Sequence, residues 1–203
     1  EIYTLYVNDA LPIRHFKNKT LATTYYHIHN DLAVRAGKGD QNAQFELYEL
    51  YYRAMFNTAI RIVKDGMIAE ELMQDGFMTA FTKMDKWHQK SSFGAWLKRV
   101  VINECLDYLA KKKLDTVSME EMQIPDTEDE ILDEPDYDVH EIKKAMSHLP
   151  DGYRAILSLY LFEGYDHEEI SEIMKITSST SRSQYLRAKK KLIELINKKE
   201  YVG

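Results

Sequence analysis

Positive charge gathers near the C-terminal end of the chain in a pattern suited to nucleic acid. The helix predicted over residues 179–199 carries seven Lys and Arg residues and one acidic residue, Glu194. A helix that enters DNA by its N-terminus would present residues 179–183 to base edges, and its later cations would meet phosphates. Its predicted buried seam is Ser181, Tyr185, Ala188, Leu192 and Leu195. Charge alone fits a solvated basic helix equally well.

The residues before this helix favour DNA binding over simple solvation. A short helix is predicted to begin at Asp166, and Glu169 three residues later completes the spacing of a capping box. A turn over residues 175–178 separates the two helices. A short helix, a turn and a longer basic helix form the helix-turn-helix arrangement, whose second helix reads DNA.

Cations and aromatic rings also meet in the first half of the chain. Lys98, Arg99, Asn103 and Asp107 share one sector of a helix predicted to begin near Phe93 and to end in the three lysines of 111–113. The rings that precede or open this helix are Trp87, His88, Phe93 and Trp96. Rings for unstacked bases and cations for the backbone are what single-stranded DNA needs. Phe93 and Trp96 are explained equally well as core residues.

A polar face lies on the helix predicted over residues 67–84, and it consists of Glu70, Glu71, Gln74 and Asp75. Such a face is usually only solvated. If it has a function, it suits a protein partner with basic residues, because DNA would repel the carboxylates.

Charge is unevenly distributed along the 203 residues, which carry a net charge of −6. Residues 115–141 hold twelve Asp and Glu and no Lys or Arg, so the rest of the chain is net positive. This acidic stretch contains Pro125 and Pro135 and shows no sustained period, which predicts a flexible linker extended by self-repulsion.

Apolar residues recur at helical spacing on both sides of this linker. The first predicted helix has the stripe Phe45, Tyr48, Tyr52, Met55, Phe56, Ala59, Ile60 and Val63, and Asp65-Gly66 separates it from the next. We therefore predict an all-α fold of two small helical domains, a bundle over 31–113 and a helix-turn-helix domain over 141–199. Residues 114–140 form the acidic linker, and residues 1–30 form an N-terminal extension.

Catalytic and metal-binding patterns are not found in the sequence. There is no glycine-rich phosphate loop, no HExxH motif and no nucleophile elbow, so we expect no enzyme, no cofactor and no metal. The single cysteine, Cys105, excludes an intrachain disulfide and is expected in the core. No apolar run is long enough to span a bilayer, so we expect no membrane contact and a cytoplasmic location.

Two stretches of the sequence resemble a known family. GDQNAQFELYELYYRAMFNTAIRIVKDGMIAEELMQDGFMTAFTKMDKW with SSFGAWLKRVVINECLDYLAKKK resembles domain two of the extracytoplasmic-function (ECF) sigma factors of the sigma-70 superfamily. LPDGYRAILSLYLFEGYDHEEISEIMKITSSTSRSQYLRAKKKL resembles their domain four. The two stretches occur in the family's order and spacing, which is far more specific than a lone helix-turn-helix.

The resemblance implies partners and site residues. Core RNA polymerase would be bound through its largest-subunit clamp helices and its flap, with the clamp contacts made by Glu70, Glu71, Leu72, Gln74, Asp75 and Phe77. The melted downstream promoter element would be held in domain two by Lys86, Trp87, His88, Gln89, Lys90, Ser91, Lys98, Arg99, Asn103, Lys111 and Lys112. The upstream promoter element would be read in domain four by Ser178, Ser179, Thr180, Arg182, Ser183, Gln184, Arg187 and Lys190.

Two positions depart from the family pattern, and both bear on upstream recognition. Ser179-Thr180 stands where Gly then Thr is usual, so the backbone before the reading helix can differ. Leu186 replaces a small or polar residue, and it would contact a thymine methyl group or another protein.

The N-terminal extension lies outside the resemblance. It is either a tail without fixed structure or a docking segment for a partner protein, such as an anti-sigma factor or a protein that brings the chain to DNA. Two other functions also remain open for the whole chain. One is a helix-turn-helix regulator that acts without polymerase, and the other is a sigma-like decoy that titrates an inhibitor.

Overall fold

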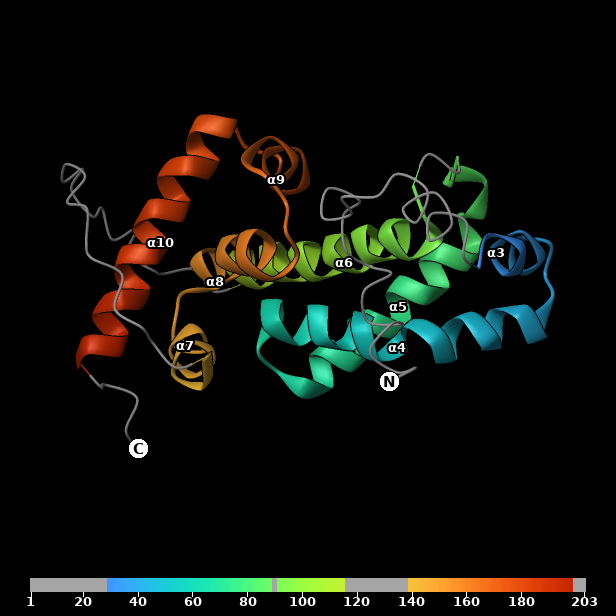
Figure 1. The fold of residues 1–203 in the computed structure, drawn as a ribbon, viewed down its shortest axis with the longest axis horizontal. Coiled ribbons are helices and arrows are strands. Elements are labelled where there is room, and N and C mark those ends of the chain that lie inside the picture. Colours follow the sequence, from blue (N-terminus) through green and yellow to red (C-terminus); the bar gives the residue numbers. More distant parts are fainter. Residues whose placement is uncertain (1–28, 89–90, 116–138, 199–203) are drawn as a thin grey trace, which may run out of the picture.

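The computed structural model describes residues 29–88, 91–115 and 139–198, and all regular structure in that part of the chain is helical (Figure 1). The first group of elements is α3 (Asn30–Gly37), α4 (Gln41–Val63), α5 (Gly66–Thr82), the 3-10 turn η3 (Met84–Lys86) and α6 (Phe93–Asp115). The second is α7 (Val139–Met146), α8 (Asp151–Leu157), the π-helical turn η4 (Ser158–Phe162), α9 (His167–Met174) and α10 (Ser178–Lys198). The predicted all-α, two-domain fold is confirmed.

Helices α3 to α6 form the N-terminal module, in which α5 packs on both α4 and α6. Asp40 caps α4 by accepting from the Ala43 N–H, and Asp65 caps α5 by accepting from two N–H groups of its first turn. The close contact of α5 with α6 needs Gly76, because a Cβ there would lie 2.5 Å from Val101 Cγ2. Cys105 is buried in this core as predicted, and burial above all, with the charge of Glu104, raises the pKa of its thiol to about 12.

The predicted stripe of α4 is confirmed in part. All of its residues are buried or half-buried except Phe45, which is 62% exposed, and the prediction missed Leu47 and Tyr51, which are buried. The fully buried row is Ala43, Leu47, Tyr51, Met55, Thr58, Ala59, Ile62 and Val63. Helix α4 has apolar residues on more than one face, so spacing of three and four residues fits two rows, and the packing of α3, α5 and α6 selects one of them.

Helices α7 to α10 form the C-terminal module. The predicted capping box is present, since Asp166 accepts from the Glu169 N–H and the Glu169 carboxylate accepts from the Asp166 N–H. Gly164 has φ 75°, a left-handed conformation that reverses the chain between η4 and α9. The predicted seam of α10 lies against the module, with Ser181, Ala188, Leu192 and Leu195 buried and Tyr185 half-buried.

The two modules lie against each other rather than apart. In Figure 1, α8 lies beside the end of α6 and separates it from α10. Helix α8 packs on α4, and the buried side chains of both modules belong to one continuous cluster. The predicted N-terminal extension and most of the predicted linker lie outside the described residues, and none of the described helices is long and apolar enough to cross a membrane.

Candidate nucleic-acid interface

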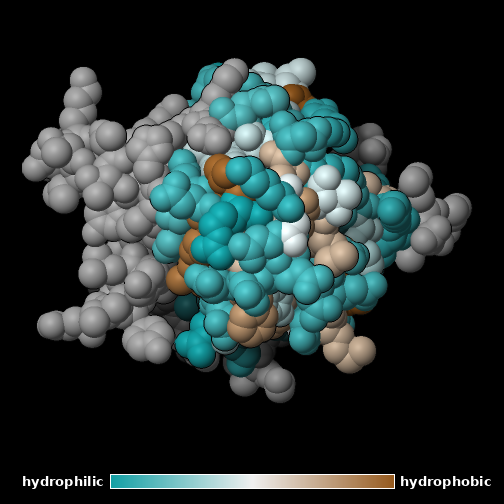
Figure 2. All heavy atoms as spheres, turned by 90° about the vertical axis from the view of Figure 1, so that its right-hand side faces the viewer, coloured by the Kyte–Doolittle hydropathy of each residue, from teal (hydrophilic) through white to brown (hydrophobic). Residues whose placement is uncertain are grey.

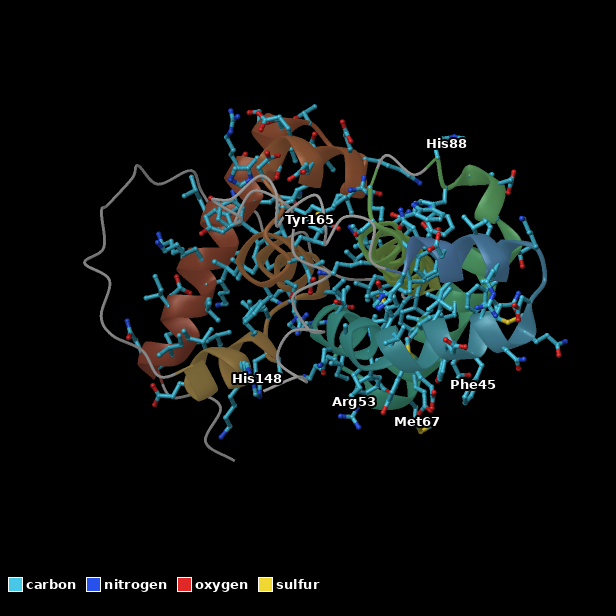
Figure 3. The ribbon with its side chains drawn as sticks, turned by 45° about the vertical axis from the view of Figure 1, so that its right-hand side comes forward. Phe45, Arg53, Met67, His88, His148 and Tyr165 are labelled. Atoms are coloured by element: carbon cyan, nitrogen blue, oxygen red, sulfur yellow. The ribbon has the colours of Figure 1, made fainter. Side chains whose placement is uncertain are left out.

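The polar face of α5 is open to solvent. Glu70, Glu71, Gln74 and Asp75 are all exposed. Two methionines that the sequence analysis did not single out lie on the same helix, with Met67 83% and Met78 66% exposed. In Figure 3, Met67 projects from the lower edge of the N-terminal module. We call Met67, Glu70, Glu71, Gln74, Asp75 and Met78 the α5 face. It combines carboxylates with apolar side chains, as protein-binding surfaces do.

The other two residues predicted to contact polymerase, Leu72 and Phe77, are buried and support the α5 face from behind. The Phe77 ring packs on Tyr48 with 4.9 Å between ring centroids. The end of the molecule that carries α3 and the start of α4 is mainly hydrophilic, with scattered apolar side chains (Figure 2).

The loop before α6 presents cations rather than its tryptophan. Trp87 is 7% exposed, its Nε1–H donates to the Ser91 carbonyl (3.1 Å), and its ring meets Phe93 edge-on. Lys86 and His88 are exposed, and Figure 3 shows His88 at the edge of the module opposite Met67. In this arrangement the Trp87 ring holds the loop on the core, so it offers no face to a base. Ser91 is half-buried, and Gln89 and Lys90 lie outside the described residues.

The predicted DNA-binding residues of α6 fall into two groups. Asn103, Lys111 and Lys112 are exposed. Lys98 is 5% exposed and Arg99 is half-buried, because both lie under the C-terminal module. DNA can therefore reach Lys98 only if the modules separate.

The predicted reading residues lie on the accessible side of α10, within residues 178–190. Arg182 and Lys190 are exposed, and Arg182 forms an ion pair with Glu168 of α9 at 3.1 Å. The half-buried or exposed remainder is Ser178, Ser179, Thr180, Ser183, Gln184 and Arg187. Thr177 caps the helix, since its hydroxyl accepts from the Thr180 N–H at 3.0 Å. Leu186 is 52% exposed on the same helix.

A polar and aromatic cluster holds α10 in place. His167 Nδ1 lies 3.0 Å from the hydroxyl of buried Ser181. The His167 ring stacks on Tyr160, and Tyr160 packs on Tyr185 with 4.5 Å between ring centroids. These contacts fix the angle of α10 against α9, so the reading side of α10 points away from the module.

The contact between the modules involves residues that the sequence analysis missed. Glu163 is 2% exposed and lies 2.8 Å from Lys98 Nζ, and it also pairs with Arg61. The Thr58 hydroxyl donates to Glu163 Oε1 at 3.1 Å. Burial pushes the pKa of Glu163 upward, but Lys98 and Arg61 together outweigh it and hold the pKa below its ordinary value. The carboxylate is therefore ionised and fully engaged at neutral pH.

Two further side chains of the C-terminal module cap the end of α4. Buried Arg154 donates from Nε to the Ile62 carbonyl at 3.0 Å, and the Ser158 hydroxyl donates to the Arg61 carbonyl at 3.2 Å. The last carbonyls of a helix have no hydrogen-bond partner within it, and a cation at this end also interacts favourably with the helix dipole. No local pattern in the sequence signals these contacts, because their partners lie more than ninety residues apart.

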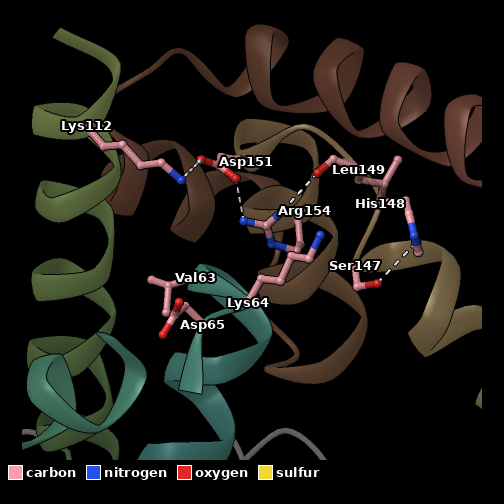
Figure 4. Close-up of a pocket in the computed structure, with 9 residues that line it drawn as sticks. All are labelled: Val63, Lys64, Asp65, Lys112, Ser147, His148, Leu149, Asp151 and Arg154. Carbon is pink, nitrogen blue, oxygen red and sulfur yellow. Dashed lines mark hydrogen bonds and ion pairs between the residues drawn. The ribbon is translucent and has the colours of Figure 1, made fainter. Parts of the chain in front are cut away.

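A cleft of about 380 Å³ lies along the same seam (Figure 4). It is lined by Val63, Lys64, Asp65, Lys112, Ser147, His148, Leu149, Asp151 and Arg154. Arg154 is committed to Ile62, Leu149 and Asp151, and Lys112 Nζ lies 3.5 Å from Asp151. The cleft is thus part of the joint between the modules. Among the described residues, no three His, Cys, Asp or Glu side chains are grouped to hold a metal.

Comparison with known proteins identifies both modules. Residues 47–114 match the family model described as Sigma-70 region 2, and residues 140–192 match Sigma-70, region 4. The ECF RNA polymerase sigma factor SigM of Bacillus subtilis is 31% identical over 75% of this chain and 94% of its own length. The RNA polymerase sigma-H factor of Pseudomonas aeruginosa is 28% identical over 78% and 88%.

Two solved structures share the fold. The sigma factor RpoE of Bartonella quintana, in complex with the anti-sigma factor NepR, matches with TM-score 0.53 and 27% identity over 75% of this chain and 95% of its own. CnrH in complex with the cytosolic domain of CnrY matches with TM-score 0.52 and 21% identity over 82% and 95%. Both sigma regions are present in order, and the match to SigM spans 94% of the length of SigM. The chain therefore belongs to the ECF sigma factors of the sigma-70 family.

Proposed function

We propose that this chain is a transcription initiation factor that binds core RNA polymerase and directs it to promoter DNA. The observation that carries the proposal is the presence of regions 2 and 4 in one chain, each with an open surface of the expected character. The chain works by binding and performs no covalent chemistry.

The α5 face is proposed to dock on the clamp helices of the largest polymerase subunit. Its carboxylates are exposed and suited to basic residues of a partner, and Met67 and Met78 add apolar area to the contact. Because Leu72 and Phe77 are buried, we assign them the role of holding α5 rather than touching polymerase.

Promoter DNA is proposed to contact the chain at two places. Lys86, His88 and Asn103 are exposed on the N-terminal module and suit the backbone and bases of a melted strand. Arg182, Arg187 and Lys190 of α10 suit the phosphates of the upstream duplex. The C-terminal module is also proposed to contact the polymerase flap. The assignment of a base contact to Trp87 would require the loop to leave the core.

A partner protein is proposed to control the factor. In the two solved structures described above, RpoE is bound to the anti-sigma factor NepR, and CnrH is bound to the cytosolic domain of CnrY. If the N-terminal extension docks such a partner here, deleting residues 1–28 will reduce its capture in a pull-down. Unchanged capture would place the contact on the helical modules.

Transcription with purified core polymerase tests the proposed function. We expect transcripts from fragments of the source genome only when core enzyme and the chain are both present. A regulator that acts alone would shift duplex DNA without core enzyme and would add no transcript. A decoy would bind an inhibitor protein and start no transcript either, so the three functions are separated in one set of reactions.

A further inference from the structure

Three donors of the N-terminal module converge on one carboxylate of the C-terminal module. The Thr58 hydroxyl and the Arg61 guanidinium both reach Glu163 Oε1, and Lys98 Nζ reaches Oε2 at 2.8 Å. Thr58 and Arg61 come from one face of α4, and Lys98 comes from α6. Thr58, Lys98 and Glu163 are all 5% exposed or less, whereas the Arg61 side chain is 30% exposed, so solvent reaches the site only at Arg61. We call Thr58, Arg61 and Lys98 the oxyanion site.

The oxyanion site offers more hydrogen-bond donors than Glu163 fills. Arg61 and Lys98 both contact the same carboxylate. In the described part of the chain, Arg61 Nε is buried and has no hydrogen-bond acceptor. Buried polar groups normally find a partner, so a spare donor at a charged site points to a ligand with more acceptor oxygens. A phosphate group has the charge and the extra oxygens that a carboxylate lacks.

The residues next to Glu163 cover the neighbouring cations of the N-terminal module. The Arg61 guanidinium lies 5.5 Å from the centre of the Phe162 ring, and Arg99 lies 6.0 Å from that of Tyr165. Figure 3 shows Tyr165 between the two modules. Arg154 and Ser158 fasten this segment by capping α4. One segment of the C-terminal module therefore covers Arg61, Lys98 and Arg99 at the same time.

We propose that Thr58, Arg61 and Lys98 form a binding site for a backbone phosphate of the melted promoter strand, which Glu163 occupies in the closed chain. Strand binding and closure then exclude each other, because both need the same three donors. The free factor is held closed by its own carboxylate, and DNA displaces that carboxylate when the modules separate. This inference rests on the proposed function, since it assigns a further contact to the strand-binding module.

Two variants that break the same ion pair from opposite sides separate this site from a merely structural joint. Glu163→Gln removes the carboxylate and keeps both cations, whereas Lys98→Gln removes a cation and keeps the carboxylate. Glu163→Gln removes the anion that Arg61 and Lys98 share, and Lys98→Gln removes one of the two cations that hold Glu163, so both should favour separation of the modules. Only Glu163→Gln should then bind strand better. Glu172→Gln is the matched control, because it makes the same charge change at an exposed position of the C-terminal module.

Opening is measured by energy transfer between dyes on full-length chains carrying Asn42→Cys and Lys198→Cys, both exposed positions on different modules. Buried Cys105 does not compete for the dyes, because its raised pKa keeps it a protonated thiol. Strand affinity is measured without polymerase, from the anisotropy of a labelled single-stranded oligonucleotide. Circular dichroism shows whether each variant keeps its helices.

We expect Glu163→Gln to lower the transfer efficiency and to raise strand affinity at least tenfold, because an open state present in about one chain in ten or fewer lowers the apparent affinity by at least that factor. Lys98→Gln should lower the transfer without raising the affinity, and adding it to Glu163→Gln should abolish the gain. The proposal is overturned if Glu163→Gln opens the chain but binds strand like the wild type, or if it stays closed with its helices intact. If Glu163→Gln loses its helices, strand affinity is compared between Lys98→Gln and the wild type. An affinity higher in Lys98→Gln would refute a role for Lys98 in strand binding, and an affinity that is not raised supports it. A wild-type chain that starts no transcript with core enzyme would refute the proposed function instead.

Discussion

Arg154 is the side chain whose removal should weaken the closed fold most. It is 3% exposed and donates to the Ile62 carbonyl at 3.0 Å and to the Leu149 carbonyl at 2.9 Å, and it pairs with Asp151 (Figure 4). The substitution Arg154→Met keeps much of the side-chain volume but removes every donor. Two carbonyl oxygens then remain at the seam without their cationic donor.

The cost follows from these contacts. A hydrogen bond from a charged group contributes about 1.5–3 kcal/mol, and two such bonds are lost. The pair with half-buried Asp151 adds at most about 1 kcal/mol, since solvent screens it. We therefore expect the free energy of unfolding to fall by about 3–7 kcal/mol. With a urea m-value of about 2 kcal/mol/M, the midpoint should fall by about 1.5–3.5 M.

Urea unfolding followed by circular dichroism measures this effect. Arg182→Met is the control, because Arg182 is exposed and forms an ion pair with exposed Glu168. Its free energy of unfolding should stay within about 0.5 kcal/mol of the wild type. Ser158→Ala removes only the bond to the Arg61 carbonyl and should cost about 1 kcal/mol. If Arg154→Met unfolds at the same urea concentration as Arg182→Met, the capping of α4 by the C-terminal module does not stabilise the fold.

Three further outcomes are expected. Gly76→Ala should destabilise the N-terminal module by about 1–3 kcal/mol, because the new methyl group meets Val101 Cγ2 at 2.5 Å; a thermal midpoint equal to the wild type would show that α5 and α6 can move apart freely. The pKa of Glu163 is lowered in the closed chain, so its contribution to closure is complete above the ordinary value of 4.5 and is lost as the pH falls through the lowered pKa. Energy transfer between dyes on the two modules measures this loss. Opening near pH 6 would instead implicate a histidine. Arg187→Ala should weaken duplex binding and flatten the slope of affinity against salt by about one unit, and an unchanged slope would remove Arg187 from the phosphate contacts.

Local signals in the sequence predicted the elements well. The capping box at Asp166 and Glu169, the break at Asp65-Gly66 and the seam of α10 are all present, because each depends on neighbours within a few residues. The stripe of α4 was predicted only in part, since Phe45 is exposed and buried Leu47 and Tyr51 were missed. Its tyrosines and aliphatic residues satisfy helical spacing on two faces, and only contacts with α3, α5 and α6 decide which face is buried.

The candidate sites divide in the same way. Exposure of the α5 polar face was predictable, since a helix with one apolar stripe must leave the rest in water. The burial of Lys98 was not, because its partner Glu163 is brought to it by tertiary packing. In a sequence, a lysine that is paired and buried looks the same as a lysine that waits for phosphate. The π-helical turn before Glu163 likewise has no sequence signal that we used.

Binding of the chain to core RNA polymerase tests the central claim most directly. The measurement is co-elution of purified chain and core enzyme in size-exclusion chromatography, with Glu71→Lys and Asp75→Lys combined to reverse the charge of the α5 face. The wild-type chain should elute with the enzyme, and the doubly reversed chain should elute alone while keeping its helices. A wild-type chain that elutes apart from core enzyme, or a reversed chain that binds it equally well, would contradict the account.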